Sequence, residues 1–85
     1  MESKLSNNFR KSFRKLHPRI QEKAAEKISI FEQNPFDLRL DTHKLHGEDK
    51  EIWAFSVTKS YRIKFVFTDE QTALFLEIGT HDIYK

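Results

Sequence analysis

The sequence predicts a single α+β domain over residues 1–85, in which a two-helix hairpin packs on one face of a small, twisted antiparallel sheet. Three observations lead to this prediction. Apolar residues recur with helical spacing in the first half of the chain, and they alternate with polar residues in the second half. Eight Phe, two Tyr and one Trp also supply enough apolar area for a chain of this length to fill a core.

The first half predicts two consecutive helices. Ser6 is a suitable N-cap for the first helix, and the residues of its apolar face are Phe9, Phe13 and Leu16. His17-Pro18 ends that helix, because proline disfavours helical geometry in the residue before it, and Pro18 then suits the first turn of the second helix. The second apolar stripe consists of Ile20, Ala24, Ile28 and Phe31. Asn34-Pro35 ends the second helix, and the short connection predicts an antiparallel hairpin.

The second half predicts three half-buried antiparallel strands, because apolar and polar residues alternate there. The predicted strands are residues 52–58 (IWAFSVT), 61–67 (YRIKFVF) and 73–78 (ALFLEI). In the last of these, Leu74, Leu76 and Ile78 are expected to face the core. A fourth, weaker strand is expected either around Leu40–Leu45 or in the segment before Ser6.

Side-chain parity restricts how these strands pair. If Val57 faces Tyr61, then Phe55 faces Ile63 and Ser56 faces Arg62. If Phe67 faces Thr72, then Phe65 faces Leu74 and Arg62 faces Glu77. These registers set Ser56, Arg62 and Glu77 in a row on the face that the helices leave uncovered, and His81 joins them if the strand continues past Gly79. An ordinary cross-strand ion pair between Arg62 and Glu77 explains part of this row equally well.

Composition and charge limit the classes of function. The chain has no cysteine, which excludes disulfides and thiolate metal sites, and it has no apolar run typical of a signal peptide or a membrane span, so a cytoplasmic protein is expected. His43, His46 and His81 are not expected to form a metal site, because no carboxylate at a suitable spacing accompanies them. Residues 1–47 hold ten Lys/Arg against six Asp/Glu. This basic half either contacts phosphates or an acidic protein, or is a solvated helix surface.

A sheet that carries Arg, His and Tyr has the groups needed to cut RNA. Cleavage by the ribose 2′-hydroxyl needs a base, an acid for the leaving oxygen and a cation at the phosphate, and it needs no metal. Arg62 suits the phosphate because a guanidinium binds it through two nitrogens and keeps its charge. His81 is suited to proton transfer near neutral pH. Tyr84 is suited to stack on an unstacked base.

The chain resembles the RelE/ParE toxin superfamily of bacterial and archaeal toxin–antitoxin modules, and the RelE and YafQ branch in particular. The resemblance runs from about Phe9 to Tyr84. It is carried by the aromatic followed by Tyr-Arg-Ile in the middle strand, the His-x-Leu-x-Gly before the predicted strands, and the terminal Gly-Thr-His. It implies two helices packed on a curved antiparallel sheet, and an mRNA endonuclease that acts on the ribosome and is neutralised by a cognate antitoxin.

The resemblance also implies roles for individual residues. Arg62 matches the arginine that stabilises the scissile phosphate, and His81 matches an acid/base histidine. His43 matches the histidine of the YafQ-like Asp-His-x-Leu, although DTHKL inserts a threonine here, and Tyr84 stands near the terminal aromatic. Lys59 occupies the position of the glutamate base of the YoeB branch. The catalytic candidates are therefore Arg62, His81, His43, Tyr84 and Lys59.

Further residues are candidates for contact with RNA. They are Lys64, Lys44, Ser56, Arg14 and Lys15. Two RelE lysines on the strand that begins at Trp53 have no counterpart in Ala54 or Ser56, and Ser56 replaces a YafQ histidine. Two other functions of the same fold therefore stay open, a ParE-like gyrase poison and a catalytically inactive antitoxin-binding module. The expected partners are the antitoxin, the ribosome and translated mRNA, with no membrane, metal or cofactor.

Overall fold

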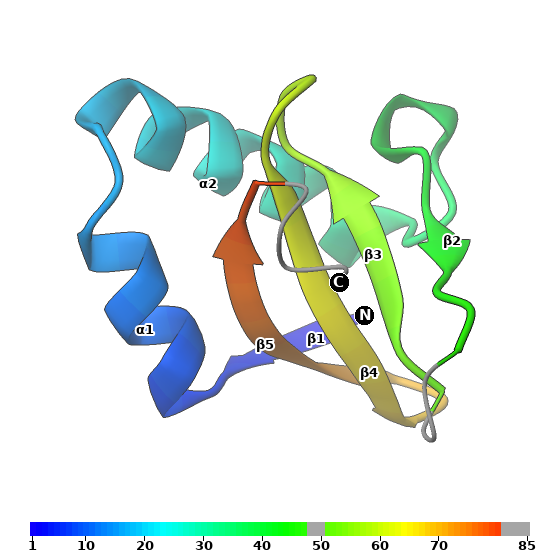
Figure 1. The fold of residues 1–85 in the computed structure, drawn as a ribbon. Helices are drawn as coiled ribbons and strands as arrows, with labels where there is room; N and C mark the ends of the chain where they lie inside the picture. The colour runs from blue at the N-terminus through cyan, green and yellow to red at the C-terminus, as the bar shows by residue number, and fades with distance from the viewer. Residues whose placement is uncertain (48–50, 81–85) are drawn as a thin grey trace.

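The computed structural model describes residues 1–47 and 51–80. The elements in chain order are β1 (Glu2–Leu5), α1 (Asn7–Arg14), α2 (Pro18–Gln33), the 3₁₀ helix η1 (Leu38–Leu40), β2 (His43–Lys44), β3 (Trp53–Ser56), β4 (Arg62–Asp69) and β5 (Thr72–Gly79). Figure 1 shows α2 passing behind the sheet and α1 beside β5. Within the described ranges, no helix combines the length and apolarity needed to cross a bilayer.

Both predicted helix starts are confirmed. The Ser6 side-chain oxygen accepts the backbone N–H of Phe9 at 3.0 Å and donates to the Leu76 carbonyl at 3.0 Å, which fixes the start of α1 to β5. At the start of α2, Nδ1 of His17 accepts the N–H of Arg19 at 3.1 Å, and Pro18 takes the first helical position. The helices therefore begin where the sequence places caps, and both pack on the sheet as predicted.

The sheet has five strands in the order β1-β5-β4-β3-β2. The predicted antiparallel arrangement holds from β2 to β5, and both positions considered for a weak fourth strand form strands. The sheet is mixed rather than wholly antiparallel, because β1 pairs with β5 in parallel. Both helices and the other strands separate β1 from β5 in sequence, so no hairpin turn forces these two strands to run in opposite directions.

The predicted register is confirmed between β3 and β4, where Phe55 lies opposite Ile63 and Ser56 opposite Arg62. It is wrong between β4 and β5. Arg62 lies opposite Gly79, and Glu77 lies opposite Lys64. Arg62 thus lies two residues further along β5 than expected. One residue of this offset is already present at Phe65, which lies opposite Phe75, and the other arises at an irregularity between Lys64 and Phe65, where β5 contains one residue more than β4.

The register between this irregularity and the β4–β5 turn corrects the expected core face of β5. Phe65 lies opposite Phe75 rather than Leu74, and Phe67 lies opposite Ala73 rather than Thr72. Thr72 pairs instead with Asp69 next to the turn, and a second register shift lies between Phe67 and Asp69. A slip of one residue exchanges the two faces of a strand. Ala73 and Phe75 are therefore fully buried, while Leu74 and Leu76 are only half-buried. The prediction of Ile78 as a core residue is correct.

Phenylalanine rings form the centre of the core. Five of them have no more than 2% exposed area, namely Phe9, Phe31, Phe55, Phe65 and Phe75. Phe31 of α2 stacks on Phe55 with 4.8 Å between ring centroids and meets Phe65 and Phe75 edge-on at 4.9 and 5.3 Å. One helical side chain thus contacts three strands, which holds α2 against one face of the sheet.

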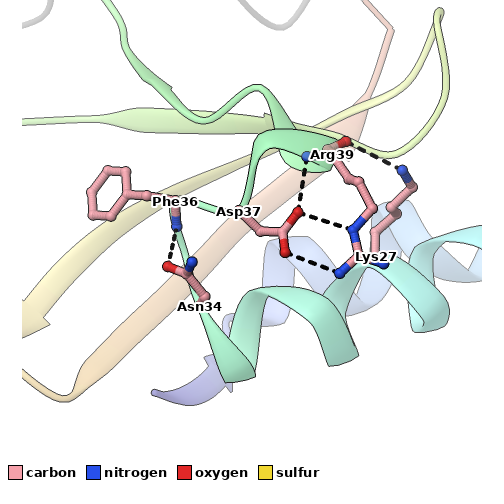
Figure 2. Close-up of polar contacts among 5 residues, drawn as sticks. All are labelled: Lys27, Asn34, Phe36, Asp37 and Arg39. Carbon is pink, nitrogen blue, oxygen red and sulfur yellow. Dashed lines mark hydrogen bonds and ion pairs between the residues drawn. The ribbon is translucent and has the colours of Figure 1, made fainter.

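Local hydrogen bonds order the segment between α2 and β2 (Figure 2). The Asn34 side chain accepts the N–H of Phe36 at 3.0 Å, and Asp37 accepts the N–H of Arg39 at 2.9 Å. The Arg39 guanidinium donates to both carboxylate oxygens of Asp37 at 3.0 and 2.9 Å, and these bonds lower the pKa of Asp37 to about 2. Lys27 reaches the Arg39 carbonyl at 3.3 Å, and Leu40 is buried. The start of β2 is positioned by this turn.

Candidate functional site

The face of the sheet opposite the helices, here called the helix-distal face, carries polar residues from β2, β3, β4 and β5. Phe55, Ile63 and Phe65 belong to the buried core on the helix side, and successive residues of a strand point to opposite faces. The intervening residues of β3 and β4 therefore lie on the helix-distal face. Together with the residues paired to them on β2 and β5, they are His43, Ala54, Ser56, Arg62, Lys64, Glu77 and Gly79.

These residues form two neighbouring rows across the strands. The first row runs His43, Ala54, Lys64 and Glu77 from β2 to β5. The second row runs Ser56, Arg62 and Gly79. Neighbouring strands in a sheet lie about 4.7–4.9 Å apart. The structure thus brings together four of the candidates predicted from sequence, Arg62, His43, Lys64 and Ser56.

The Arg62 guanidinium is anchored by the β3–β4 turn. Its Nη1 atom donates to the carbonyl oxygens of Thr58 at 2.7 Å, Lys59 at 3.2 Å and Tyr61 at 3.3 Å. The turn itself is closed by a 2.9 Å bond from the N–H of Val57 to the Tyr61 carbonyl. Within residues 1–47 and 51–80, Nε and Nη2 of Arg62 donate no hydrogen bond. The opposite edge of the guanidinium thus keeps two donors for a phosphate.

The expected ion pair between Arg62 and Glu77 does not form. Arg62 donates instead to the carbonyls of the β3–β4 turn, and its strand partner on β5 is Gly79. In the described part of the chain, the Glu77 carboxylate accepts no hydrogen bond and has no ion pair, although its backbone is paired with Lys64 in the sheet. An ordinary cross-strand ion pair with Glu77 therefore does not explain the position of Arg62 in this row.

His43 lies on β2 at the edge of the sheet and is exposed. Its Nδ1 atom lies 2.8 Å from the Asp41 carbonyl oxygen. Because a carbonyl oxygen only accepts, this contact assigns the proton of a neutral ring to Nδ1 and makes Nε2 the basic nitrogen. The imidazole has the chemistry of a proton carrier at one end of the first row.

The remaining candidates are more scattered. Lys59 is exposed in the β3–β4 turn. Lys44 lies opposite Trp53, on the strand face alternate to His43, and its ammonium is 3.3 Å from Glu51. Arg14 ends α1 and Lys15 caps it, so neither belongs to the helix-distal face. His81 and Tyr84 lie outside the described residues, and their roles stay predictions.

A second feature was not predicted from sequence. A groove of about 480 Å³ lies between β1, α1 and α2, and its lining residues are Leu5, Phe9, Arg10, Phe13, Arg14, Ala25 and Ile28. The floor is apolar, and Arg10 and Arg14 are exposed. The sequence feature that could have indicated this groove is the apolar pair Phe9 and Phe13. Phe9 is fully buried, whereas Phe13 stays partly exposed.

A smaller hollow of about 220 Å³ follows the edge of β2, lined by His43, Lys44, Leu45 and His46. Two histidines lie in it, but no group of three or more His, Cys, Asp or Glu side chains suited to a metal occurs in the described ranges. The chemistry available at the described part of the helix-distal face is therefore that of cations and proton carriers.

No protein-family model matches this sequence, and no curated protein matches it either. Solved structures do match over nearly the whole chain. The YoeB/ParE toxin from Agrobacterium tumefaciens has 16% sequence identity and a TM-score of 0.79, over 95% of this chain and 99% of that one. A chain of the toxin–antitoxin complex RelBE2 from Mycobacterium tuberculosis has 22% identity and a TM-score of 0.77, over 94% and 96%.

YafQ from Escherichia coli also matches, with 17% identity and a TM-score of 0.78 over 96% of this chain and 94% of that one. All three similarities extend over the sheet and both helices, because they cover more than nine-tenths of each chain. The chain therefore has the fold of the RelE/ParE toxin superfamily.

Proposed function

We propose that this protein is the toxin of a type II toxin–antitoxin pair and that it cleaves mRNA on the ribosome, in the cytoplasm. The observation that carries the proposal is the anchored guanidinium of Arg62. Nη1 is held by three turn carbonyls, and the other edge of the group keeps its donors for a phosphate. Lys64, His43 and Ser56 share its face of the sheet. The fold shared with RelE, YoeB and YafQ toxins supports the same function.

The proposed reaction is attack of the ribose 2′-oxygen on the adjacent phosphorus. Arg62 stabilises the charge that builds on the phosphate oxygens, and Lys64 adds a second cation on the same strand. A proton carrier must protonate the 5′-oxygen as it leaves. His43 is the candidate on the helix-distal face, and His81 is the candidate outside the described residues. The products are a 2′,3′-cyclic phosphate and a 5′-hydroxyl end.

Induction of the protein in growing cells, followed by mapping of transcript ends, tests this proposal. We expect new 5′-hydroxyl ends inside translated codons within minutes of induction, and none in untranslated transcripts. The Arg62→Ala protein, expressed at the same level, is the control. Gyrase-linked DNA breaks without new RNA ends would instead support a ParE-like poison, and neither kind of damage would indicate an inactive module.

We further propose that a cognate antitoxin occupies the groove between β1, α1 and α2. The floor of the groove is apolar, and Arg10 and Arg14 rim it, so it fits an amphipathic segment with acidic flanks. The solved structures of similar fold include the RelE–RelB complex of Pyrococcus horikoshii and the RelBE2 complex of Mycobacterium tuberculosis. A partner in this groove lies outside the helix-distal face.

Ala25→Glu tests the groove. Ala25 is exposed on α2 and lines the groove, so glutamate is compatible with the helix but places a bulky anion where the acidic partner binds. We expect its affinity for the protein encoded by the adjacent gene to fall by about 10- to 100-fold, because like charges oppose binding. Calorimetric titration of the purified proteins measures this change.

Ser29→Glu is the matched control for this experiment, because Ser29 is also exposed on α2 but does not line the groove. We expect its affinity to stay within about twofold of that of the unmodified protein, since surface substitutions away from a contact have small effects. Equal losses for the two variants would contradict the proposed groove, and cleavage by Ala25→Glu is expected to stay unchanged.

A further inference from the structure

The proposed reaction needs a base for the 2′-hydroxyl, and few groups on the helix-distal face can accept a proton. Arg62 and Lys64 are cations, and the hydroxyl of Ser56 is not a base near neutral pH. Within the described residues, the two rows therefore contain two bases, the imidazole of His43 and the carboxylate of Glu77.

The register places Glu77 closer to Arg62 than His43 is. Arg62 lies opposite Gly79, and Glu77 lies two residues before Gly79 on the same face of β5. Diagonal neighbours of this kind are about 7–8 Å apart between Cα atoms, within reach of long side chains. His43 lies on β2, two strands from Arg62 on β4, which is about 10 Å at the usual strand spacing.

The residue opposite Arg62 on β5 is Gly79, which has no side chain. The next side chain along β5 on the helix-distal face is therefore that of Glu77. A phosphate on the outward edge of Arg62 has its ribose within a few ångströms, because the 2′-oxygen attacks the adjacent phosphorus. A base on β5 is thus well placed beside such a ribose.

The Glu77 carboxylate is not engaged by Arg62. Glu77 is half-buried, and within the described ranges its carboxylate forms neither a hydrogen bond nor an ion pair. The Arg62 guanidinium does not pair with it, because Nη1 is held by the carbonyls of the β3–β4 turn. The lone pairs of the carboxylate are therefore not committed to Arg62.

We propose that Glu77 is the general base of the cleavage reaction. This assignment rests on the proposed function. The Glu77 carboxylate takes the proton of the 2′-hydroxyl as the 2′-oxygen bonds to phosphorus. The bond from phosphorus to the 5′-oxygen breaks, and that oxygen takes a proton from the general acid. Arg62 holds the phosphate through both events, and the proton on Glu77 returns to water after the products leave.

Glu77→Gln tests the assignment because glutamine keeps the size of the side chain and removes its basicity. The assay measures single-turnover cleavage of a defined mRNA on programmed ribosomes, at saturating protein, and measures ribosome binding separately. General base catalysis contributes about 100- to 10,000-fold, so we expect the cleavage rate to fall at least 100-fold. Binding should stay equal or become tighter, because a negative charge next to a phosphate has been removed.

Two further variants make the test decisive. Glu70→Gln, in the exposed turn between β4 and β5, removes the same charge away from the face and should cleave at the unmodified rate. Glu77→Asp keeps a carboxylate, and we expect it to cleave at least tenfold faster than Glu77→Gln. A purely structural role would lower melting temperature and binding together, and aspartate would give no advantage in the rate of chemistry.

The outcomes separate the two proposals. If the unmodified protein cleaves and Glu77→Gln cleaves equally fast, the role of Glu77 is wrong and the proposed function stands. If Glu77→Asp is no faster than Glu77→Gln, the role of Glu77 is also wrong. If the unmodified protein does not cleave mRNA on ribosomes at all, the proposed function fails and the role of Glu77 fails with it.

Discussion

Replacing Arg62 with alanine is expected to lower the rate of mRNA cleavage by about 100- to 1,000-fold, the usual effect of removing one group that stabilises transition-state charge. The guanidinium projects from the helix-distal face and bonds the carbonyls of an exposed turn. Its loss therefore removes few contacts to the core. Single-turnover cleavage on programmed ribosomes measures the effect, and circular dichroism verifies that the fold is kept.

Arg19→Ala is the matched control for Arg62→Ala, because Arg19 is an exposed arginine at the start of α2. We expect this variant to cleave within about twofold of the unmodified rate. Arg62→Lys should recover only part of the activity, since an ammonium lacks the planar fork that binds phosphate through two nitrogens. A folded Arg62→Ala protein that arrests growth normally would show that Arg62 does not hold the phosphate.

Phe31→Ala is expected to lower the free energy of unfolding by about 3–5 kcal/mol, the range found for large aromatic residues in cores. Phe31 is completely buried and contacts Phe55, Phe65 and Phe75 on three strands. Small domains have only about 5–15 kcal/mol of stability in total. Denaturant unfolding measures the loss, and a large share of the variant should be unfolded at 37 °C.

Phe36→Ala provides the comparison for Phe31→Ala. Phe36 is 54% exposed and lies at the rim of the sheet, 5.7 Å from Trp53 between ring centroids. We expect a loss of about 1 kcal/mol, close to the value of one aromatic contact. Equal losses for the two variants would mean that the stability of this protein does not depend on the contact between α2 and the three strands.

Local sequence signals determined the helices and the hairpin between β3 and β4. Ser6 and Pro18 mark helix starts through effects that act within one turn of helix, so no distant residue is needed to predict them. The turn after Val57 is short and sets the pairing of Ser56 with Arg62 in the same local way. The placement of Arg62 and Ser56 on one face of the sheet followed directly.

The register of β5 is not determined by local signals. Residues 73–76 are Ala-Leu-Phe-Leu, so all four are apolar and alternation does not distinguish the two faces there. Contacts from distant elements decide between the faces. Phe75 packs against Phe31, and Leu5 of β1 lies opposite Phe75 in the sheet. The irregularity between Lys64 and Phe65 accommodates one more residue in β5 than in β4.

The candidate site likewise has features that local sequence predicts and features that only tertiary packing sets. The position of Arg62 follows from strand parity within a local hairpin. His43 was a candidate only through the resemblance of its motif, and its position on the helix-distal face depends on the pairing of β2 with β3. The register that sets Glu77 opposite Lys64 and Gly79 opposite Arg62, and the groove beside Arg10, depend on how β1, β5 and the helices meet. Only tertiary packing decided these features, since each joins segments that are dozens of residues apart and have no local signal for their relative position.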